Sequence, residues 1–153
     1  MKQDLVERLR SLGILPSAQR VAVARFVLAT DAHPCAEDVL RAVQDEIPMI
    51  SLATVYNTLN LFAEKGLLKK LALSEGKVVF DPRIEPHHHL IDEQSGAILD
   101  LPWDALRVER ADAAGRERGF DVTAYQVVLR GRRAAKRGGA TPARATRRKQ
   151  ARG

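Results

Sequence analysis

SLATVYNTLNLFAEKG, residues 51–66, is the stretch on which the fold prediction depends. Ser51 can cap the start of a helix and Gly66 can end it, and apolar residues recur between them at helical spacing, at Val55, Leu59 and Phe62. The other face has short polar side chains and one aromatic instead of the Lys and Glu of most solvated helices. Such a face can read DNA base edges, or it can be an ordinary polar surface.

The segments around this helix favour the first interpretation. Residues 67–73 and 77–80 read as a β-hairpin, and amphipathic helices are predicted upstream at 4–12, 18–30 and about 36–46. Helices followed by a two-stranded ribbon predict a winged helix-turn-helix domain, with 51–65 as the helix that enters the major groove. Arg20, in the first turn of its helix, opposes the helix dipole and is a candidate phosphate contact, although a solvated arginine fits equally well.

Downstream of residue 86 the predicted elements are mainly strands, in the order strand, strand, helix, strand. Strands are predicted at 87–91 and 97–101, a helix at 102–118 and a last strand at 120–129. The predicted fold class is therefore α+β, with an N-terminal winged helix-turn-helix domain (1–80), a hinge (81–86) and a small α/β dimerisation domain (87–130). The open sheet edges of that domain could pair with a second copy of the chain.

The net charge of +6 comes from the C-terminal tail. Ten of the 25 Lys and Arg residues lie in residues 130–153, which have no acidic residue, so the remaining 15 stand against all 19 acidic residues in 1–129. We expect 131–153 to be a disordered basic tail. No apolar run is long enough to cross a bilayer and no signal peptide is recognisable, which predicts a cytoplasmic protein without membrane contact.

Three of the four histidines are adjacent, at His87, His88 and His89. In an extended segment His87 and His89 point to one side and His88 to the other. With Asp81 and Asp100 they make a candidate metal site, and His33, if it joins the same ion, would tie two domains together. Three roles stay open for His88: a surface residue, a residue that supports the ligands from behind, or a ligand itself if the predicted strand register is wrong.

These motifs together resemble the ferric uptake regulator (Fur) superfamily, and most closely its peroxide-sensing PerR branch. The resemblance rests on ATVYNTL, VVFD, the HHH cluster and GAILDLP, and covers residues 1 to about 130. It implies a homodimeric repressor, not an enzyme, that binds an inverted-repeat operator in double-stranded DNA when one Fe(II) or Mn(II) per protomer is bound and needs no small-molecule substrate. The implied metal ligands are His33, Asp81, His87, His89 and Asp100.

The same resemblance assigns further roles. His33 and His87 match the ligands that peroxide oxidises in the iron-bound proteins. The residues expected at the DNA are Arg20, Ser51, Thr54, Tyr56 and Asn57.

The chain departs from the family pattern at two places. Residues 92–95, DEQS, stand where most members have the first of two CxxC pairs, and the chain has one cysteine, Cys35, so a structural zinc site made of four cysteines is predicted absent. Residues 122–125, VTAY, lack the histidine of a further site found in iron-uptake members. Cys35 itself is either a thiol activated by a helix start or a small buried residue.

Three alternatives remain open. One is an iron- or haem-responsive repressor of the same superfamily. The second is a non-haem iron enzyme, because two histidines and a carboxylate also make an oxygenase site. The third is a metal-independent basic protein that compacts DNA through its tail.

Overall fold

The computed structural model describes residues 2–74 and 76–134, so the predicted tail lies largely outside the described residues. Four helices come first: α1 (Lys2–Ser11), α2 (Ala18–Ala29), α3 (Ala36–Val43) and α4 (Leu52–Glu64). A hairpin of β1 (Lys69–Ser74) and β2 (Lys77–Asp81) follows, and the rest contains β3 (His88–Asp92), β4 (Ile98–Leu101), a 3₁₀ turn (Trp103–Ala105), α5 (Ala111–Arg116) and β5 (Val128–Gly131). Within this part no helix is long and apolar enough to span a membrane.

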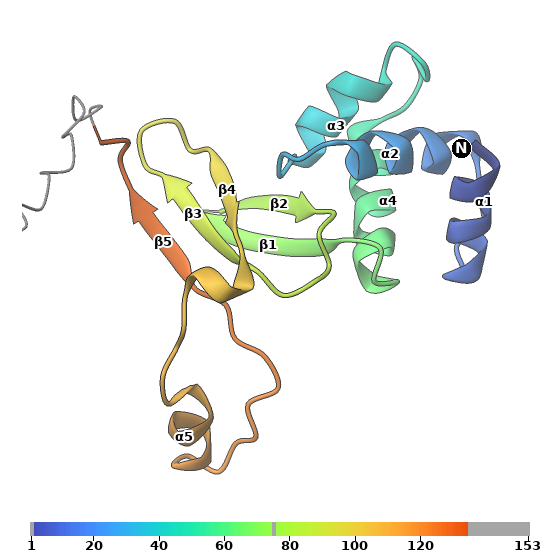
Figure 1. Cartoon of the computed structure of the whole chain (residues 1–153). Coiled ribbons are helices and arrows are strands. Elements are labelled where there is room, and N and C mark those ends of the chain that lie inside the picture. The colour runs from blue at the N-terminus through green and yellow to red at the C-terminus, as the bar shows by residue number, and fades with distance from the viewer. Residues whose placement is uncertain (1, 75, 135–153) are drawn as a thin grey trace, which may run out of the picture.

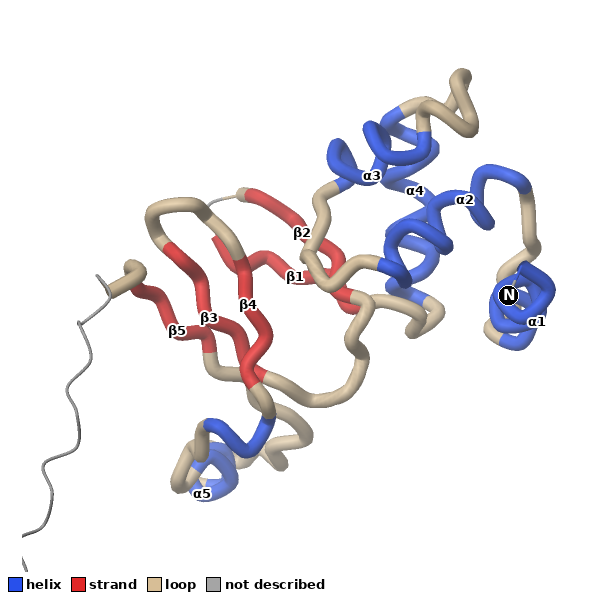
Figure 2. The backbone as a smooth tube through the Cα atoms, turned by 45° about the horizontal axis from the view of Figure 1, so that its top comes forward, coloured by secondary structure: helices blue, strands red, loops and turns tan. Residues whose placement is uncertain are grey.

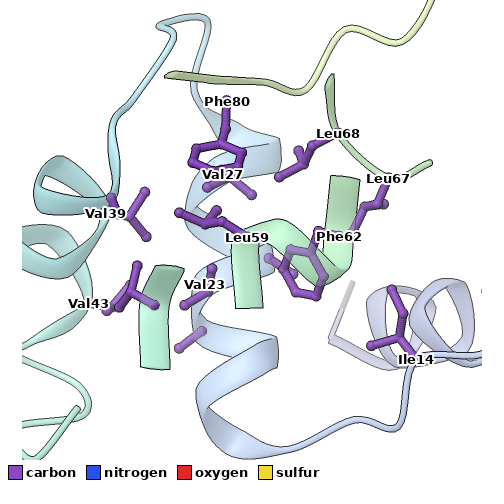
Figure 3. Close-up of a cluster of buried hydrophobic side chains, with 14 of the residues drawn as sticks. Ile14, Val23, Val27, Val39, Val43, Leu59, Phe62, Leu67, Leu68 and Phe80 are labelled. Carbon is purple, nitrogen blue, oxygen red and sulfur yellow. The ribbon is translucent and has the colours of Figure 1, made fainter. Parts of the chain in front are cut away.

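Helices α2, α3 and α4 pack around one apolar core (Figure 3). Ser17 and Ser51 cap α2 and α4, because each hydroxyl accepts a hydrogen bond from the backbone N–H three residues on. The side chains that fill the core are fully buried, among them Val23, Val27, Val39, Leu59, Phe62 and Phe80. Phe80 comes from β2, so the hairpin is part of the same unit, and the predicted winged helix-turn-helix architecture is confirmed.

The hairpin lies between the helices and the second sheet (Figures 1 and 2). That sheet has the order β4-β3-β5, with β3 antiparallel to β4 and parallel to β5. His89 pairs with Asp100 across β3 and β4, and with Val128 across β3 and β5. The central strand of this sheet therefore carries part of the histidine cluster.

The helix predicted over 102–118 is wrong. Only the 3₁₀ turn and α5 are helical there, and they are separated by a loop. Leu106 is extended, at φ −137° and ψ 140°, and its carbonyl oxygen lies 3.4 Å from His88 Nε2. Arg110 is left-handed, at φ 65°, and its side chain forms an ion pair with Glu117. Tertiary contacts thus divide a segment whose local pattern favoured one helix.

The strand predicted over 120–129 is also mostly wrong, since β5 begins only at Val128. Residues 120–127 return from α5 to the sheet without pairing as a strand, and α5 lies beyond one end of the sheet (Figure 1). The N–H of Phe120 donates to Gly115 O, and the N–H of Val127 donates to His88 Nδ1. These bonds satisfy backbone groups that a longer ladder would otherwise pair.

Cys35 precedes α3 and is buried. Its N–H donates to Asp38 Oδ2 at 3.0 Å, and its thiol contacts the same oxygen at 2.9 Å. Burial and then the hydrogen bond to Asp38 raise the pKa of the thiol, whereas an activated thiol would have a lowered pKa. Of the two roles open for Cys35, the small buried residue is the one found.

Gly115→Ala should destabilise the C-terminal part. A Cβ at this position would lie 2.3 Å from Val122 Cγ2 and 3.0 Å from Phe120 O. Such overpacking costs about 1–3 kcal/mol, which urea or thermal unfolding measures. Gly115→Ala combined with Val122→Ala removes the closer clash and should recover part of the loss. A single variant as stable as the native chain would show that the 115–122 contact is looser than described.

The thiol of Cys35 should react slowly with iodoacetamide at neutral pH. Its raised pKa leaves less thiolate than an ordinary cysteine has, and burial restricts access. We expect a rate lower than that of the urea-unfolded chain by on the order of tenfold or more. Equal rates in the two states, followed by mass spectrometry, would contradict this assignment.

Candidate metal centre

Three histidine side chains and two carboxylates meet where the N-terminal domain faces the second sheet. His33 comes from the loop between α2 and α3, Asp81 ends β2, His87 directly precedes β3, His89 lies in β3, and Asp100 lies in β4. The loop that carries His33 is fixed to the hairpin because the N–H of Phe80 donates to Pro34 O at 2.9 Å. Residues predicted as metal ligands from four separate segments are thus brought together.

The donor atoms face one another at short distances. One nitrogen from each of His33, His87 and His89 and one oxygen of Asp100 lie within 4.8 Å of each other. His87 Nε2 lies 3.0 Å from His89 Nε2, and His33 Nε2 lies 3.0 Å from Asp100 Oδ1. Asp81 Oδ2 is 2.9, 3.6 and 3.8 Å from the Nε2 atoms of His87, His89 and His33. Two donors about 2.1 Å from one ion and at right angles to it lie about 3.0 Å apart, so this spacing suits an octahedral ion.

The inward carboxylate oxygens are the strongest sign that a cation belongs here. Asp81 Oδ2 and Asp100 Oδ1 are buried and make no hydrogen bond within the part of the chain that the structure describes. The Asp81 side chain is fully buried and that of Asp100 is 26% exposed. Buried carboxylate oxygens are normally paired or bound to a metal, and therefore this donor set fits a divalent ion.

The surroundings of His87 and His89 suit nitrogen ligands of a metal. His87 Nδ1 lies 2.8 Å from Glu85 O, and because a carbonyl only accepts, Nδ1 carries the hydrogen and Nε2 keeps its lone pair. Burial lowers the pKa of His89, and the neighbouring His87 and His33 lower it further, which favours the uncharged imidazole. Glu85 O also accepts from Lys69 Nζ of β1 at 3.1 Å.

His88 is not directed at this cluster. Its ring is fully buried against Trp103 and Tyr125, with ring centroids 4.7 and 6.0 Å away, and those two rings also contact each other at 4.6 Å. Nδ1 accepts from the N–H of Val127 at 3.2 Å, and Nε2 faces Leu106 O. The alternation of His87, His88 and His89 is as predicted, but the surface position considered for His88 is wrong.

Sequence reasoning missed three groups beside the cluster. Arg83 contacts both carboxylates, and the Glu85 carbonyl and Lys69 stand behind His87. The role of the Glu85 carbonyl has no signal in the sequence. Arg83 could have been noticed, because it is a cation that lies between Asp81 and Asp100 in the sequence.

The residues predicted at the DNA lie on α2 and α4. Arg20, Thr54 and Asn57 line a hollow of about 350 Å³ together with Ser17, Gln19 and Thr58. Ser51 Oγ accepts from the N–H of Thr54 and caps α4. Tyr56 is 37% exposed on α4, and Lys70 Nζ of β1 lies 5.5 Å from its ring centroid. Arg20 also donates to Leu15 O at 2.8 Å, so its guanidinium is held beside the hollow.

Comparisons with known proteins agree with this description. The model of the "Ferric uptake regulator family" matches residues 11–130. The "Peroxide-responsive repressor PerR" of Staphylococcus aureus (strain Mu50 / ATCC 700699) is 33% identical over 130 residues, which cover 84% of this chain and 86% of that protein.

Solved structures agree as well. The ferric uptake regulator from Pseudomonas aeruginosa with manganese has a TM-score of 0.66 at 27% identity and covers 84% of this chain and 97% of its own. The Campylobacter jejuni peroxide stress regulator has a TM-score of 0.63 at 28% identity and covers 88% and 96%. On the family match and this breadth of coverage, the chain belongs to the ferric uptake regulator family.

Proposed function

We propose that this protein is a metal-dependent, DNA-binding transcriptional repressor that senses peroxide. The observation that carries the proposal is the cluster of three imidazoles and two carboxylates, drawn from the helical domain, the hairpin and the second sheet. The peroxide-responsive repressor and the peroxide stress regulator among its relatives support the signal.

The proposed ligands are His33, Asp81, His87, His89 and Asp100, with Fe(II) or Mn(II) as the ion. Three imidazoles and two carboxylate oxygens form a set of borderline and hard donors suited to these metals. Five protein donors leave one octahedral position, which a peroxide molecule could approach. We expect one ion per protomer.

The proposed division of labour follows the chain. Residues 1–80 bind DNA through Arg20, Ser51, Thr54, Tyr56 and Asn57, residues 81–86 form the hinge, and residues 87–130 form the dimer. The second sheet offers an apolar row for a second copy, since Leu90 is paired with Leu99 on one side and with Leu129 on the other, and both partners are more than a third exposed. A two-fold dimer would match an inverted-repeat operator.

The cluster can couple the metal to DNA because its members belong to both domains. His33 and Asp81 are fixed to the winged helix, and His89 and Asp100 to the second sheet. Bound metal would hold these parts at one angle and set the distance between the two α4 helices of a dimer. A coupling of about 1–3 kcal/mol is typical of such linkage.

Fe(II) held by these five residues would supply the redox chemistry that activates peroxide, with one peroxide oxygen added at a ring C–H and the other leaving as water. The proposed targets are His33 and His87, whose ring carbons would gain oxygen. An oxidised imidazole is a poorer ligand, so the ion that holds the two domains together would be lost. The operator would then be released. The same architecture without histidine oxidation would serve an iron- or haem-responsive repressor.

One observation keeps the enzyme alternative testable. A cleft of about 620 Å³ borders His87 and is lined by Lys69, Lys70 and Tyr125 among others. Against a catalytic role, five protein donors leave too few positions for oxygen and a substrate. Metal-dependent binding of a palindromic DNA, without turnover of any small molecule, separates the two functions.

Mn(II) should be required for a shift of operator DNA, and His89→Ala and Asp100→Ala should abolish it. Each substitution removes one donor, and each variant should lose Mn(II) and DNA binding together, as isothermal titration and gel shift would measure. Asp45→Ala, which removes an exposed carboxylate outside the cluster, is the matched control and should behave like the native chain. Tight, metal-independent DNA binding by Asp100→Ala would refute the proposed coupling.

Peroxide should add one oxygen atom to a peptide that contains His33 or His87 in the Fe(II)-loaded protein, and none in the Mn(II)-loaded protein. Tandem mass spectrometry locates the modification, and the fraction of modified chain should track the loss of DNA binding. If neither peptide is modified after peroxide treatment of the Fe(II)-loaded protein, the peroxide-sensor proposal fails and the iron- or haem-responsive repressor is left.

A further inference from the structure

Arg83 lies between Asp81 and Asp100 and contacts both. Its backbone N–H donates to Asp81 Oδ1 at 2.7 Å. Its guanidinium Nη1 lies 3.5 Å from Asp100 Oδ2. One residue therefore meets a carboxylate at the end of the hairpin and another in the second sheet.

Each of these contacts uses the oxygen that faces away from the histidines. The remaining oxygens, Asp81 Oδ2 and Asp100 Oδ1, face the imidazole nitrogens and make no hydrogen bond among the described residues. In each carboxylate, one oxygen therefore contacts Arg83 and the other faces the position that an ion would occupy. Contacts to the outer oxygen, here a hydrogen bond on Asp81 and an ion pair on Asp100, orient a ligating carboxylate and belong to the design of a metal site.

We propose that Arg83 is a positioning residue that fixes Asp100, and through its backbone Asp81, as one-oxygen ligands before the metal arrives. This inference rests on the proposed function and extends it to a residue behind the ligands. Asp100 needs this support most, because its side chain is the most exposed of the five and Asp81 is enclosed. The guanidinium restricts the rotation of Asp100 and holds Oδ1 toward His33, 3.0 Å away.

The positive charge of Arg83 also repels a cation, so the two effects oppose each other. Its side chain is 43% exposed, and water screens a charge in that position strongly. The effect of Arg83 on the orientation of the Asp100 carboxylate depends on direct contact, so water does not screen it in this way. The net effect of Arg83 is therefore to tighten metal binding.

Mn(II) affinity, measured from the electron paramagnetic resonance of the free ion, tests the proposal. Arg83→Ala should weaken binding by about tenfold, since loss of a group behind a ligand commonly costs about 10- to 100-fold. Arg83→Lys should recover part of the loss, because an ammonium can still reach Asp100 Oδ2. Arg25→Ala removes an arginine of similar exposure that pairs with Glu46 far from the site and should bind as the native chain does.

A double-mutant cycle shows whether Arg83 acts through Asp100. Asp100→Asn, unlike Asp100→Ala, keeps an oxygen donor, so a weakened Mn(II) affinity should remain measurable. In that background Arg83→Ala should have little further effect, because the carboxylate that the guanidinium contacts is already gone. The melting temperature of the metal-free chain should be nearly the same with and without Arg83, because water screens a guanidinium that is 43% exposed.

Two results would overturn the inference: an Mn(II) affinity of Arg83→Ala equal to or above that of the native chain, or additive effects in the double-mutant cycle. The proposed function would still stand if the native chain bound Mn(II) and DNA as expected. A native chain that takes up no Mn(II) would overturn the proposed function, and this inference with it.

Discussion

Two carboxylates set the main constraint on this molecule, because each turns toward a buried histidine cluster an oxygen that makes no hydrogen bond within the described chain. Burial and the neighbouring histidines lower the pKa of His89, so positive charge on His89 does not readily offset Asp81 and Asp100. Uncompensated charge in such surroundings costs several kcal/mol per ion. A divalent cation at the centre would offset both charges and give Asp81 Oδ2 and Asp100 Oδ1 a partner at once.

The fold supplies the cluster by ordinary means. Apolar packing holds Phe80 in the helical core, and the next residue, Asp81, is thereby placed at the domain boundary. The Pro34 carbonyl bonded to Phe80 brings His33 to the same point. Antiparallel pairing sets His89 opposite Asp100 in the second sheet. No unusual backbone geometry is needed at any of these positions, because the left-handed residues of the described chain lie elsewhere.

Periodicity and capping signals were sufficient for the N-terminal domain, since α4 and its hairpin combine a cap, an apolar stripe and a turn that all indicate the same structure. They were insufficient between residues 102 and 127. There the contacts of His88 with Leu106 and Val127 decide the path of the chain, and these depend on groups distant in sequence. The alternation of the histidines was predictable from strand geometry, whereas the enclosure of His88 by Trp103 and Tyr125 was not.

The Glu85 carbonyl has one more consequence. It accepts from Lys69, a residue of the wing, and from the Nδ1–H of His87, so one backbone oxygen joins the hairpin to a proposed metal ligand. Linkage between two binding events is reciprocal. If bound metal strengthens operator binding, operator binding must strengthen the binding of the metal by the same free energy. When the ion becomes scarce, protein that is not bound to DNA would then lose its metal first, and DNA-bound protein would lose it last.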